Sequence, residues 1–402
     1  MKIDFDREID RKSTWDLKWN GSMVADYLNT QVPEDFIPMW VADSDFACPP
    51  HVLQALWERL EKEVLGYCAP QKPFYDAVCW WQKERHGWQV DPAWITALPS
   101  VVAGINIALH VFTEEGDGVL VQTPVYDPFS TIVRRTGRRG VNNPLRQENG
   151  RFVMDYEQLE QLAADPSTKA LILCSPHNPV GRVWEAEELR RLAEICLANN
   201  VAIISDEIHS DILLADKPHT PLLSLDARYA DRFVCLTAPS KTFNIPGLKT
   251  AVAIIPNREV KEKFDQMQLA MSLDVRNTFG LVGLTASYTP EGEEWLAQEL
   301  DYLRGNVDLV EEFLARELPQ VRFIRPEGTF LCWLDCRPLG LSDEELLHRV
   351  VMEARVICVP GPWFGPGGEG YLRLNIGCTR VNLKTALERL AAVLKKGEAN
   401  GS

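Results

Sequence analysis

The chain has 402 residues, of which 46% are hydrophobic and 25% are charged. This composition is that of a globular protein and excludes a disordered or fibrous chain. At roughly 150 residues per domain, the length excludes a single small fold and predicts two or three domains, or one large domain with a smaller companion. The net charge of −15 argues against a nucleic-acid partner, because such proteins cluster Lys and Arg against phosphates. We interpret the short basic clusters Arg134-Arg135 and Arg138-Arg139 as solvated surface or subunit contact.

The sequence carries no pattern of export or membrane insertion. The N-terminal stretch MKIDFDREIDRKSTWDLKW is charged where a signal peptide needs an apolar centre, and no run reaches about 18 uninterrupted apolar residues. The ten cysteines are scattered and form no CxxC pair. We therefore expect a cytoplasmic protein with no membrane contact, whose cysteines are reduced and mostly structural.

The first 285 residues divide into an arm and a large domain. Prolines at positions 33, 38, 49 and 50 predict an irregular N-terminal arm over residues 1–50. Residues 51–285 alternate short apolar runs with helical patterns, which is typical of βαβ units and a mostly parallel sheet. Trp184–Asn200 repeats apolar residues every three or four positions and predicts a crossover helix. The expected strands are Gly118–Gln122, Ala170–Ser175, Val201–Ser205, Phe233–Thr237 and Thr250–Pro256.

The pattern changes after about residue 285. Apolar residues recur every three or four positions from Leu296 to Leu314 and predict a long helix. The elements expected after it are a strand at Phe330–Asp335, a helix from Ser342, strands at Val356–Val359 and Tyr371–Ile376, and a terminal helix from Val381. Residues 286–402 are therefore expected to form a smaller α/β domain.

Three expected strands end in residues suited to one ligand. Asn178, Asp206 and Lys241 each follow a strand, and ligands of open α/β sheets bind beyond the carboxyl ends of the strands. Burying a lysine ammonium is costly, but a lysine that forms an imine with an aldehyde cofactor avoids that cost. In that case Asp206 could hold a protonated pyridine nitrogen, and Asn178 could donate to the ring oxygen.

Each of these residues also has an ordinary interpretation when taken alone. Asn-Pro is most often a turn, an aspartate is more often a cap or a surface group, and a lysine is usually solvated. Their order and their shared position at strand ends favour the functional interpretation. A metal site built from Asp206, Glu207, His209 and Asp211 is a weaker alternative, because no second histidine stands at ligand spacing.

The stretches SPHNPVG, SDEIHSD, SKTFNIPGLK and YLRLNIGC together resemble the class I/II aminotransferase superfamily of fold-type I pyridoxal-phosphate enzymes, over nearly the whole chain. PMWVADSDF at 38–46, GYCAP at 66–70 and TPVYDPF at 123–129 more narrowly resemble its MalY/PatB branch of cystathionine β-lyases, the C–S lyases. The resemblance implies an α/β fold with a mostly parallel seven-stranded sheet flanked by helices, a smaller C-terminal domain and an arm packed on it. It also implies pyridoxal 5'-phosphate as cofactor and a homodimer with active sites at the subunit interface.

The resemblance also implies roles for single residues. Lys241 would bind the cofactor and take the substrate Cα proton, Asp206 would pair with the pyridine nitrogen, and Tyr126 would stack on the ring. Asn178 would contact the ring oxygen. His209 stands where many aminotransferases carry a tyrosine that contacts the same oxygen, and the lyase branch often has histidine there.

The remaining implied contacts concern the phosphate and the substrate. Ser100–Gly104 opens a helix-like run, whose backbone amides can bind a phosphate dianion. Ala238 replaces a common phosphate-binding hydroxyl of the superfamily. Arg373 would grip the substrate carboxylate with Asn178, since a guanidinium forms two parallel hydrogen bonds to it, and Trp40 would wall the substrate pocket. The expected phosphate contacts are Val101, Val102, Ala103, Ser240, Lys249 and, lent by the neighbouring subunit, Tyr67.

Three functions follow from these expectations. The leading hypothesis is β-elimination from an L-cysteine conjugate such as cystathionine, which yields pyruvate, ammonia and a thiol. An aminotransferase is the alternative, because it shares the steps up to removal of the Cα proton. A regulator with the same fold but idle chemistry is disfavoured, because Lys241, Asp206, Asn178 and Arg373 are all present.

Overall fold

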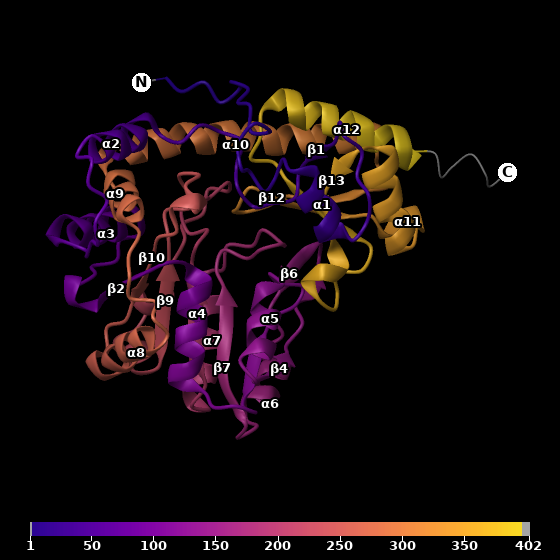
Figure 1. Cartoon of the computed structure of the whole chain (residues 1–402). Helices are drawn as coiled ribbons and strands as arrows, with labels where there is room; N and C mark the ends of the chain where they lie inside the picture. Colours follow the sequence, from indigo (N-terminus) through magenta and orange to yellow (C-terminus); the bar gives the residue numbers. More distant parts are fainter. Residues whose placement is uncertain (1, 396–402) are drawn as a thin grey trace.

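The computed structural model describes residues 2–395, and its centre is a mixed sheet of seven strands (Figure 1). The strand order is β2-β10-β9-β8-β7-β3-β4. Neighbouring strands are parallel except at β10, which runs antiparallel to both β2 and β9. The strands are β2 (Ile95–Leu98), β3 (Gly118–Val121), β4 (Arg139–Asn142), β7 (Thr168–Cys174), β8 (Ala202–Asp206), β9 (Phe233–Thr237) and β10 (Ala251–Ile254). The expected mostly parallel, seven-stranded sheet is confirmed.

Helices cover both faces of this sheet, which explains why its strands lack polar alternation. On β3, Val119 and Val121 pack into one core while Leu120 packs into the other. The first core includes residues of α4 (Val101–Phe112), α5 (Pro128–Arg135) and α8 (Arg258–Ala270). The second includes residues of α6 (Tyr156–Ala163) and α7 (Ala186–Ala198), the predicted crossover helix. Beyond the β2 edge lie α2 (Pro50–Leu60), α3 (Lys72–His86) and α9 (Thr278–Ser287).

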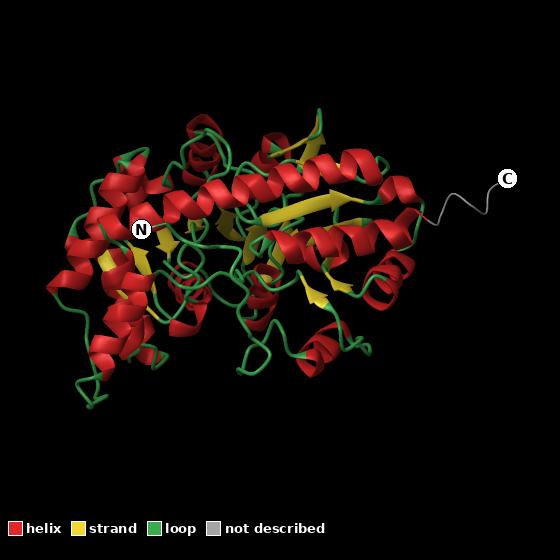
Figure 2. Cartoon of the chain, turned by 90° about the horizontal axis from the view of Figure 1, so that it is seen from above, coloured by secondary structure: helices red, strands yellow, loops and turns green. Residues whose placement is uncertain are grey.

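A second, antiparallel sheet follows the long helix α10 (Pro290–Glu317). Its order is β11-β12-β15-β14, from β11 (Arg322–Ile324), β12 (Leu331–Asp335), β15 (Tyr371–Asn375) and β14 (Val359–Pro360). Helices α10 and α12 (Arg380–Leu394) lie side by side above it, and α11 (Asp343–His348) lies at its end (Figure 2). A separate hairpin of β5 (Arg146–Glu148) and β6 (Arg151–Val153) projects beyond the first sheet.

The N-terminal arm joins this second part of the molecule. Strand β1 (Ile37–Pro38) pairs in parallel with β13 (Val356–Ile357). The strand expected over 356–359 is therefore split, because β13 pairs with the arm whereas β14 pairs with β15. The arm also holds a helix that the sequence did not predict, α1 (Gly21–Leu28), which is capped by the Asn20 side chain.

The structure bears on three further features of the sequence: the basic clusters, the absence of long apolar runs and the cysteines. Arg138 is buried within the chain, whereas the basic clusters were expected to be solvated surface or subunit contact. Its Nε donates to the Thr113 hydroxyl and its Nη2 to the Thr113 carbonyl, so it fastens the end of α4 to the turn before β4. Within residues 2–395, no helix has the length and apolar character needed to cross a membrane. All ten cysteines are free thiols.

Candidate active site

A cavity of about 180 Å³ lies beyond the carboxyl ends of β7, β8 and β9. Most of the residues singled out in the sequence line it. From that set, the lining residues are Val101, Val102, Tyr126, Asn178, Asp206, His209, Ser240, Lys241 and Lys249. The structure therefore brings these side chains or backbones to one place, at the sheet edge where the strand-end argument expected a ligand.

Lys241 follows β9 and is partly buried in the wall of the cavity. Its Nζ donates a 2.6 Å hydrogen bond to the backbone carbonyl of Ala42, in the arm. Burial, together with the nearby charges of Arg373 and Lys249, lowers the pKa of the Lys241 amine to about 8, and the charges of Asp43 and Asp206 oppose this shift. An amine with this pKa is deprotonated in part near neutral pH, which a nucleophile or a base requires.

Asp206, the last residue of β8, presents a buried carboxylate to the cavity. Its Oδ1 accepts a 3.1 Å hydrogen bond from the backbone N–H of Ile208, and no side chain of residues 2–395 forms an ion pair with it. Burial raises the pKa of this carboxyl to about 7. A buried carboxylate without a cation suits a ligand that brings a protonated nitrogen, such as a pyridinium ring.

Arg373 on β15 stands behind Asn178 rather than in the cavity wall. Its Nη1 donates to Asn178 Oδ1 at 3.1 Å, and its Nη2 donates to the Trp40 carbonyl at 2.5 Å. The buried Nε has no hydrogen-bond partner within residues 2–395. A buried guanidinium with an unused N–H beside the cavity is suited to grip a carboxylate.

Tyr126 is fixed beside the cavity by its backbone. Its N–H donates to the Asn178 carbonyl at 3.2 Å, and the N–H of Val125 donates to the Phe364 carbonyl at 2.8 Å. The ring packs edge-on against Phe129. Burial, followed by the Asp206 carboxylate, raises the Tyr126 pKa to about 12, so the phenol stays protonated.

The N-terminus of α4 forms another part of the wall. The N-cap side chain of Ser100 accepts a hydrogen bond from the Ala103 N–H at 3.1 Å, so that amide is already used. Ala103 does not line the cavity, which departs from its predicted phosphate contact, whereas Val101 and Val102 do line it. The first N–H groups of a helix lack intrahelical acceptors, and an anion can bind them. Lys249 adds a positive charge to the same cavity.

His209 is buried, and its Nδ1 has no hydrogen-bond partner among the residues that the structure describes. Burial lowers the pKa of its imidazole to about 3, assisted by the charges of Lys241 and Arg373. The ring is therefore neutral, with one nitrogen able to donate to an oxygen in the cavity.

The acidic residues near His209 serve other partners. Glu207 Oε2 lies 2.9 Å from His219 Nε2, and Asp211 accepts from Thr242 at 2.8 Å. Throughout residues 2–395, no group of three or more His, Cys, Asp or Glu side chains is arranged to hold a metal ion. The alternative metal site is not assembled in this structure.

Besides Ala103 and Arg373, two further predicted site residues lie outside the cavity. Tyr67 is 98% exposed in the loop before α3. Trp40 is buried, donates from Nε1 to the Lys18 carbonyl at 3.0 Å and packs on Tyr27 with ring centroids 4.4 Å apart. Tyr27 in turn packs on Trp363, so this aromatic group lies next to Arg373.

Ala42 and Thr250 also contribute to the cavity, although the sequence did not single them out. Ala42 contributes its carbonyl to Lys241, and Thr250 lines the wall next to Lys249. The signal for Thr250 was present, since it is a hydroxyl residue adjacent to a predicted phosphate contact. Ala42 acts through its backbone, which no side-chain pattern can indicate.

Comparison with known proteins places this arrangement in a family. The family model described as aminotransferase class I and II matches residues 34–390. The chain belongs to this family. The resemblance expected from SPHNPVG, SDEIHSD, SKTFNIPGLK and YLRLNIGC is thereby confirmed.

The narrower resemblance is confirmed as well. The chain is 42% identical to cystathionine beta-lyase PatB of Bacillus subtilis over 394 residues, which span 98% of this chain and 100% of that protein. It is 32% identical to protein MalY of Escherichia coli, over 98% of this chain and 99% of the relative. The crystal structure of the PLP-bound C-S lyase from Staphylococcus hominis matches with a TM-score of 0.90 and 31% identity, over 98% of both chains.

Proposed function

We propose that this family member is a pyridoxal-phosphate-dependent C–S lyase that cleaves L-cystathionine or a related L-cysteine conjugate to pyruvate, ammonia and a thiol. The observation that carries the proposal is the convergence of Lys241, Asp206 and Asn178 on one buried cavity, with Arg373 bonded to Asn178 behind it. The names and the overall similarity of PatB and of the C-S lyase structure support the same reaction class.

The residues present fit the cofactor. In the described part of the chain, the buried Asp206 carboxylate has no ion-pair partner and a His209 nitrogen has no hydrogen-bond partner. The α4 N-terminus and Lys249 supply positive potential at the same cavity. We assign the ring nitrogen to Asp206, the ring oxygen to Asn178 and His209, and the phosphate to the α4 amides with Lys249. When bound, pyridoxal phosphate supplies an electron-withdrawing ring that spreads the negative charge left at Cα.

The substrate is held by its carboxylate. Arg373 binds the α-carboxylate of the amino acid, and the Trp40 carbonyl and Asn178 fix the guanidinium plane in advance. Fixing the carboxylate orients the Cα–H bond toward Lys241. Tyr126 and the buried apolar wall exclude water from the reacting atoms.

Lys241 carries the proton in the reaction. Its Nζ takes the Cα proton, the Cα electron pair forms the Cα=Cβ bond, and the Cβ–S bond breaks with its electrons on sulfur. The Lys241 ammonium can then return a proton to the departing thiolate. The remaining three-carbon enamine hydrolyses to pyruvate and ammonia. The lowered pKa of Lys241, about 8, suits a group that must both accept and release a proton near neutral pH.

The deciding experiment mixes purified, cofactor-loaded protein with L-cystathionine, without any 2-oxo acid, and measures pyruvate, ammonia and homocysteine together. Equal amounts of all three products are expected. If no pyruvate forms, but addition of a 2-oxo acid gives a new amino acid, the protein is an aminotransferase and the lyase proposal is wrong.

We also propose that the active unit is a homodimer. Large apolar side chains are exposed along the end of α2 and the following loop. Tyr67, in the same loop, is also exposed and does not line the cavity of its own chain. The exposed set is Leu53, Trp57, Leu60, Val64, Leu65 and Tyr67. A second copy that covers this surface would bury these residues and could insert Tyr67 into the opposite site.

A cytoplasmic location is proposed on chemical grounds. All ten cysteines are free thiols, and seven of them are buried. An oxidising compartment favours disulfides, whereas the cytoplasm keeps thiols reduced. Fractionation of the native host should recover the protein with cytoplasmic markers, and recovery with secreted proteins would contradict this location.

A further inference from the structure

The arm reaches the active site through its backbone. We call residues Trp40–Phe46 the arm segment. Almost every carbonyl in it accepts a hydrogen bond from a side chain elsewhere in the chain, so the position of this irregular stretch is fixed by those side chains. In each of the following pairs the backbone carbonyl of the first residue accepts a hydrogen bond from the side chain of the second. The pairs are Trp40 with Arg373, Val41 with Asn375, Ala42 with Lys241, Asp43 with Lys18 and Asn375, Ser44 with Arg11 and Asn244, and Phe46 with Asn244.

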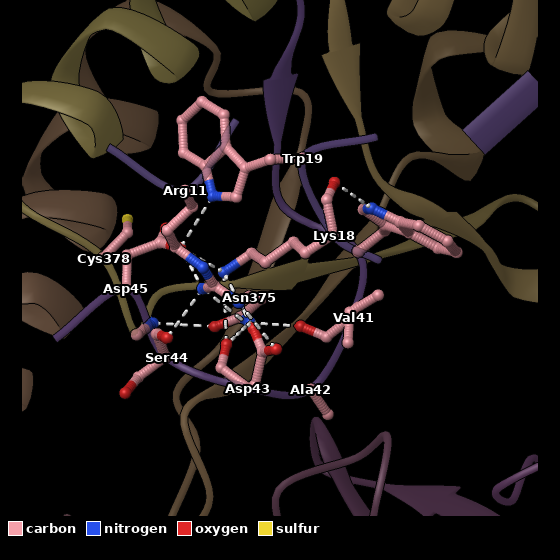
Figure 3. Close-up of polar contacts among 12 residues, drawn as sticks. Arg11, Lys18, Trp19, Val41, Ala42, Asp43, Ser44, Asp45, Asn375 and Cys378 are labelled. Carbon is pink, nitrogen blue, oxygen red and sulfur yellow. Dashed lines mark hydrogen bonds and ion pairs between the residues drawn. The ribbon is translucent and has the colours of Figure 1, made fainter. Parts of the chain in front are cut away.

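Behind this segment lies an ion-pair cluster of Arg11, Lys18, Asp43 and Asp45, which we call the arm cluster (Figure 3). Lys18 Nζ lies 3.1 Å from Asp45 Oδ1 and 3.6 Å from Asp43 Oδ1. Arg11 contacts the same two carboxylates at 2.6 and 2.9 Å. Trp19 adds a hydrogen bond from its indole to Asp45.

Lys18 is the exceptional member of the arm cluster. Its side chain is 0% exposed, whereas Arg11 and Asp43 retain 16% and 15% exposure. Complete burial of a lysine is rare and costs desolvation energy that apolar packing would not. Burial at this cost points to a role for the Lys18 charge beyond closing the arm onto the molecule.

The arm cluster adjoins the catalytic lysine. Asp43 directly follows Ala42, whose carbonyl accepts the Lys241 hydrogen bond. Burial is the largest influence on the Lys241 pKa, and the Asp43 charge comes next, ahead of Asp206. The charged and titratable groups around Lys241 are Asp43 on the arm, Asp206 and His209 at the end of β8, Lys249 after β9, and Arg373 on β15.

We propose that Lys18, acting through Asp43, is a positioning residue for Lys241: it anchors the Ala42 carbonyl against the lysine amine and balances the Asp43 charge beside it. Lys18 touches neither cofactor nor substrate in this proposal. Its ion pairs fix the arm segment, and the arm segment presents one carbonyl to Lys241 and another to Arg373. The proposal rests on the assigned role of Lys241 as the cofactor-binding lysine.

The test is a pH titration of the absorbance of the lysine-bound cofactor in the loaded enzyme. Two variants remove opposite charges from the same ion pair, Asp43→Asn and Lys18→Met. Loss of the Asp43 carboxylate removes a negative charge near Lys241, so the spectral midpoint should fall by about one pH unit. Loss of the Lys18 ammonium leaves Asp43 less neutralised, so the midpoint should rise by a similar amount.

The controls separate charge from folding. Lys18→Arg keeps the charge and should keep the wild-type midpoint. Lys384→Met removes an exposed lysine on α12, outside the arm cluster, and should not move it. Equal midpoints for wild type, Asp43→Asn and Lys18→Met, or shifts in the same direction, would overturn the proposal. If Lys18→Met does not fold, Asp43→Asn against Lys18→Arg still decides it, and an unshifted Asp43→Asn midpoint overturns it.

Failure of this proposal differs from failure of the proposed function. If the Lys241→Ala variant retains the wild-type chromophore, Lys241 is not the cofactor lysine and the functional assignment itself fails. If that chromophore is lost in Lys241→Ala while the arm variants titrate like wild type, the lyase assignment stands and only the role of Lys18 is wrong.

Discussion

Lys241 and Asp206 illustrate how burial prepares a single side chain for chemistry. Burial lowers the pKa of the lysine to about 8 and raises the pKa of the aspartate to about 7, so the two pKa values lie close together. In water they would differ by more than six pH units. Side chains with converging pKa values in one cavity are typical of sites that move protons.

Replacement of Lys241 by alanine removes the only amine that we assign to cofactor binding and proton transfer. The variant should lose the absorbance of the lysine-bound cofactor and at least about 100-fold in kcat. Absorbance spectra and pyruvate release measure these two effects. A Lys241→Ala protein that keeps its normal spectrum would contradict the assignment.

Replacement of Arg373 by lysine tests the carboxylate clamp, because lysine keeps the charge but loses the planar pair of donors. We expect kcat/KM for the amino acid to fall by about 10- to 100-fold, mostly through KM. Steady-state kinetics of Arg373→Lys and Arg373→Ala measure this. Unchanged kcat/KM in both variants would remove Arg373 from substrate binding.

The residues that could be found from the sequence share one property. Asn178, Asp206 and Lys241 follow apolar strands directly, and the geometry of a parallel sheet brings strand ends together. Lys18 and Ala42 have no such signal. The contacts of Lys18 form only when the arm folds over β15. Ala42 contributes a backbone carbonyl, which every residue type possesses.

At the scale of elements, the periodicity of apolar residues predicted those helices and strands that the local sequence pattern determines. The crossover helix α7 was expected within two residues of its bounds, whereas α10 begins six residues before the predicted apolar repeat and ends three residues after it. The antiparallel direction of β10 and the pairing of β1 with β13 were not expected, because direction and partner depend on segments far apart in the chain. The arm was expected to be irregular, yet it contains α1.

Helix α10 carries a buried carboxyl that gives a pH dependence of stability. Glu299 is 0% exposed, and neither of its carboxylate oxygens has a hydrogen-bond partner within the described residues. Burial raises its pKa well above the ordinary value of 4.5. The folded protein therefore keeps a proton on Glu299 that the unfolded chain releases. The contribution of this group to the free energy of unfolding is fully present below about pH 4.5 and is lost as pH rises through the folded pKa.

The Glu299→Gln variant should become more stable than wild type as pH rises. The difference in free energy of unfolding should grow by roughly 1 kcal/mol per pH unit above about pH 4.5, until the folded pKa is reached. Thermal unfolding of both proteins from pH 4.5 to 8 measures it. Glu294→Gln, on the exposed side of the same helix, is the control, and parallel curves for Glu299→Gln and wild type would refute the prediction.

At the scale of the whole molecule, the exposed apolar surface around α2 predicts how two subunits share a site. In a two-fold dimer, a Lys241→Ala chain impairs its own site, whereas a Tyr67→Ala chain impairs the site of its partner. Mixed dimers would then contain one site with both residues intact. Random mixing of the two impaired variants should restore about a quarter of wild-type activity.

Measurement of lyase activity before and after unfolding and refolding the mixture provides this test. The unmixed variants, treated in the same way, are the controls. No gain of activity on mixing, in a sample shown by sedimentation to be dimeric, would place Tyr67 outside the partner's site.

The contacts of the arm segment also determine when, during its synthesis, the chain can complete its folding. Trp40 and Arg373 are separated by 333 residues, and Val41 and Asn375 by 334. During translation the ribosome must therefore release nearly the whole polypeptide before these bonds can form, although the first sheet can assemble earlier. Closing so long a loop is entropically costly, and the arm is left without its partners until then. A nascent chain halted before β15 should bury its seven-stranded core yet leave Trp40 open to protease, so the enzyme cannot become active until its last strand emerges.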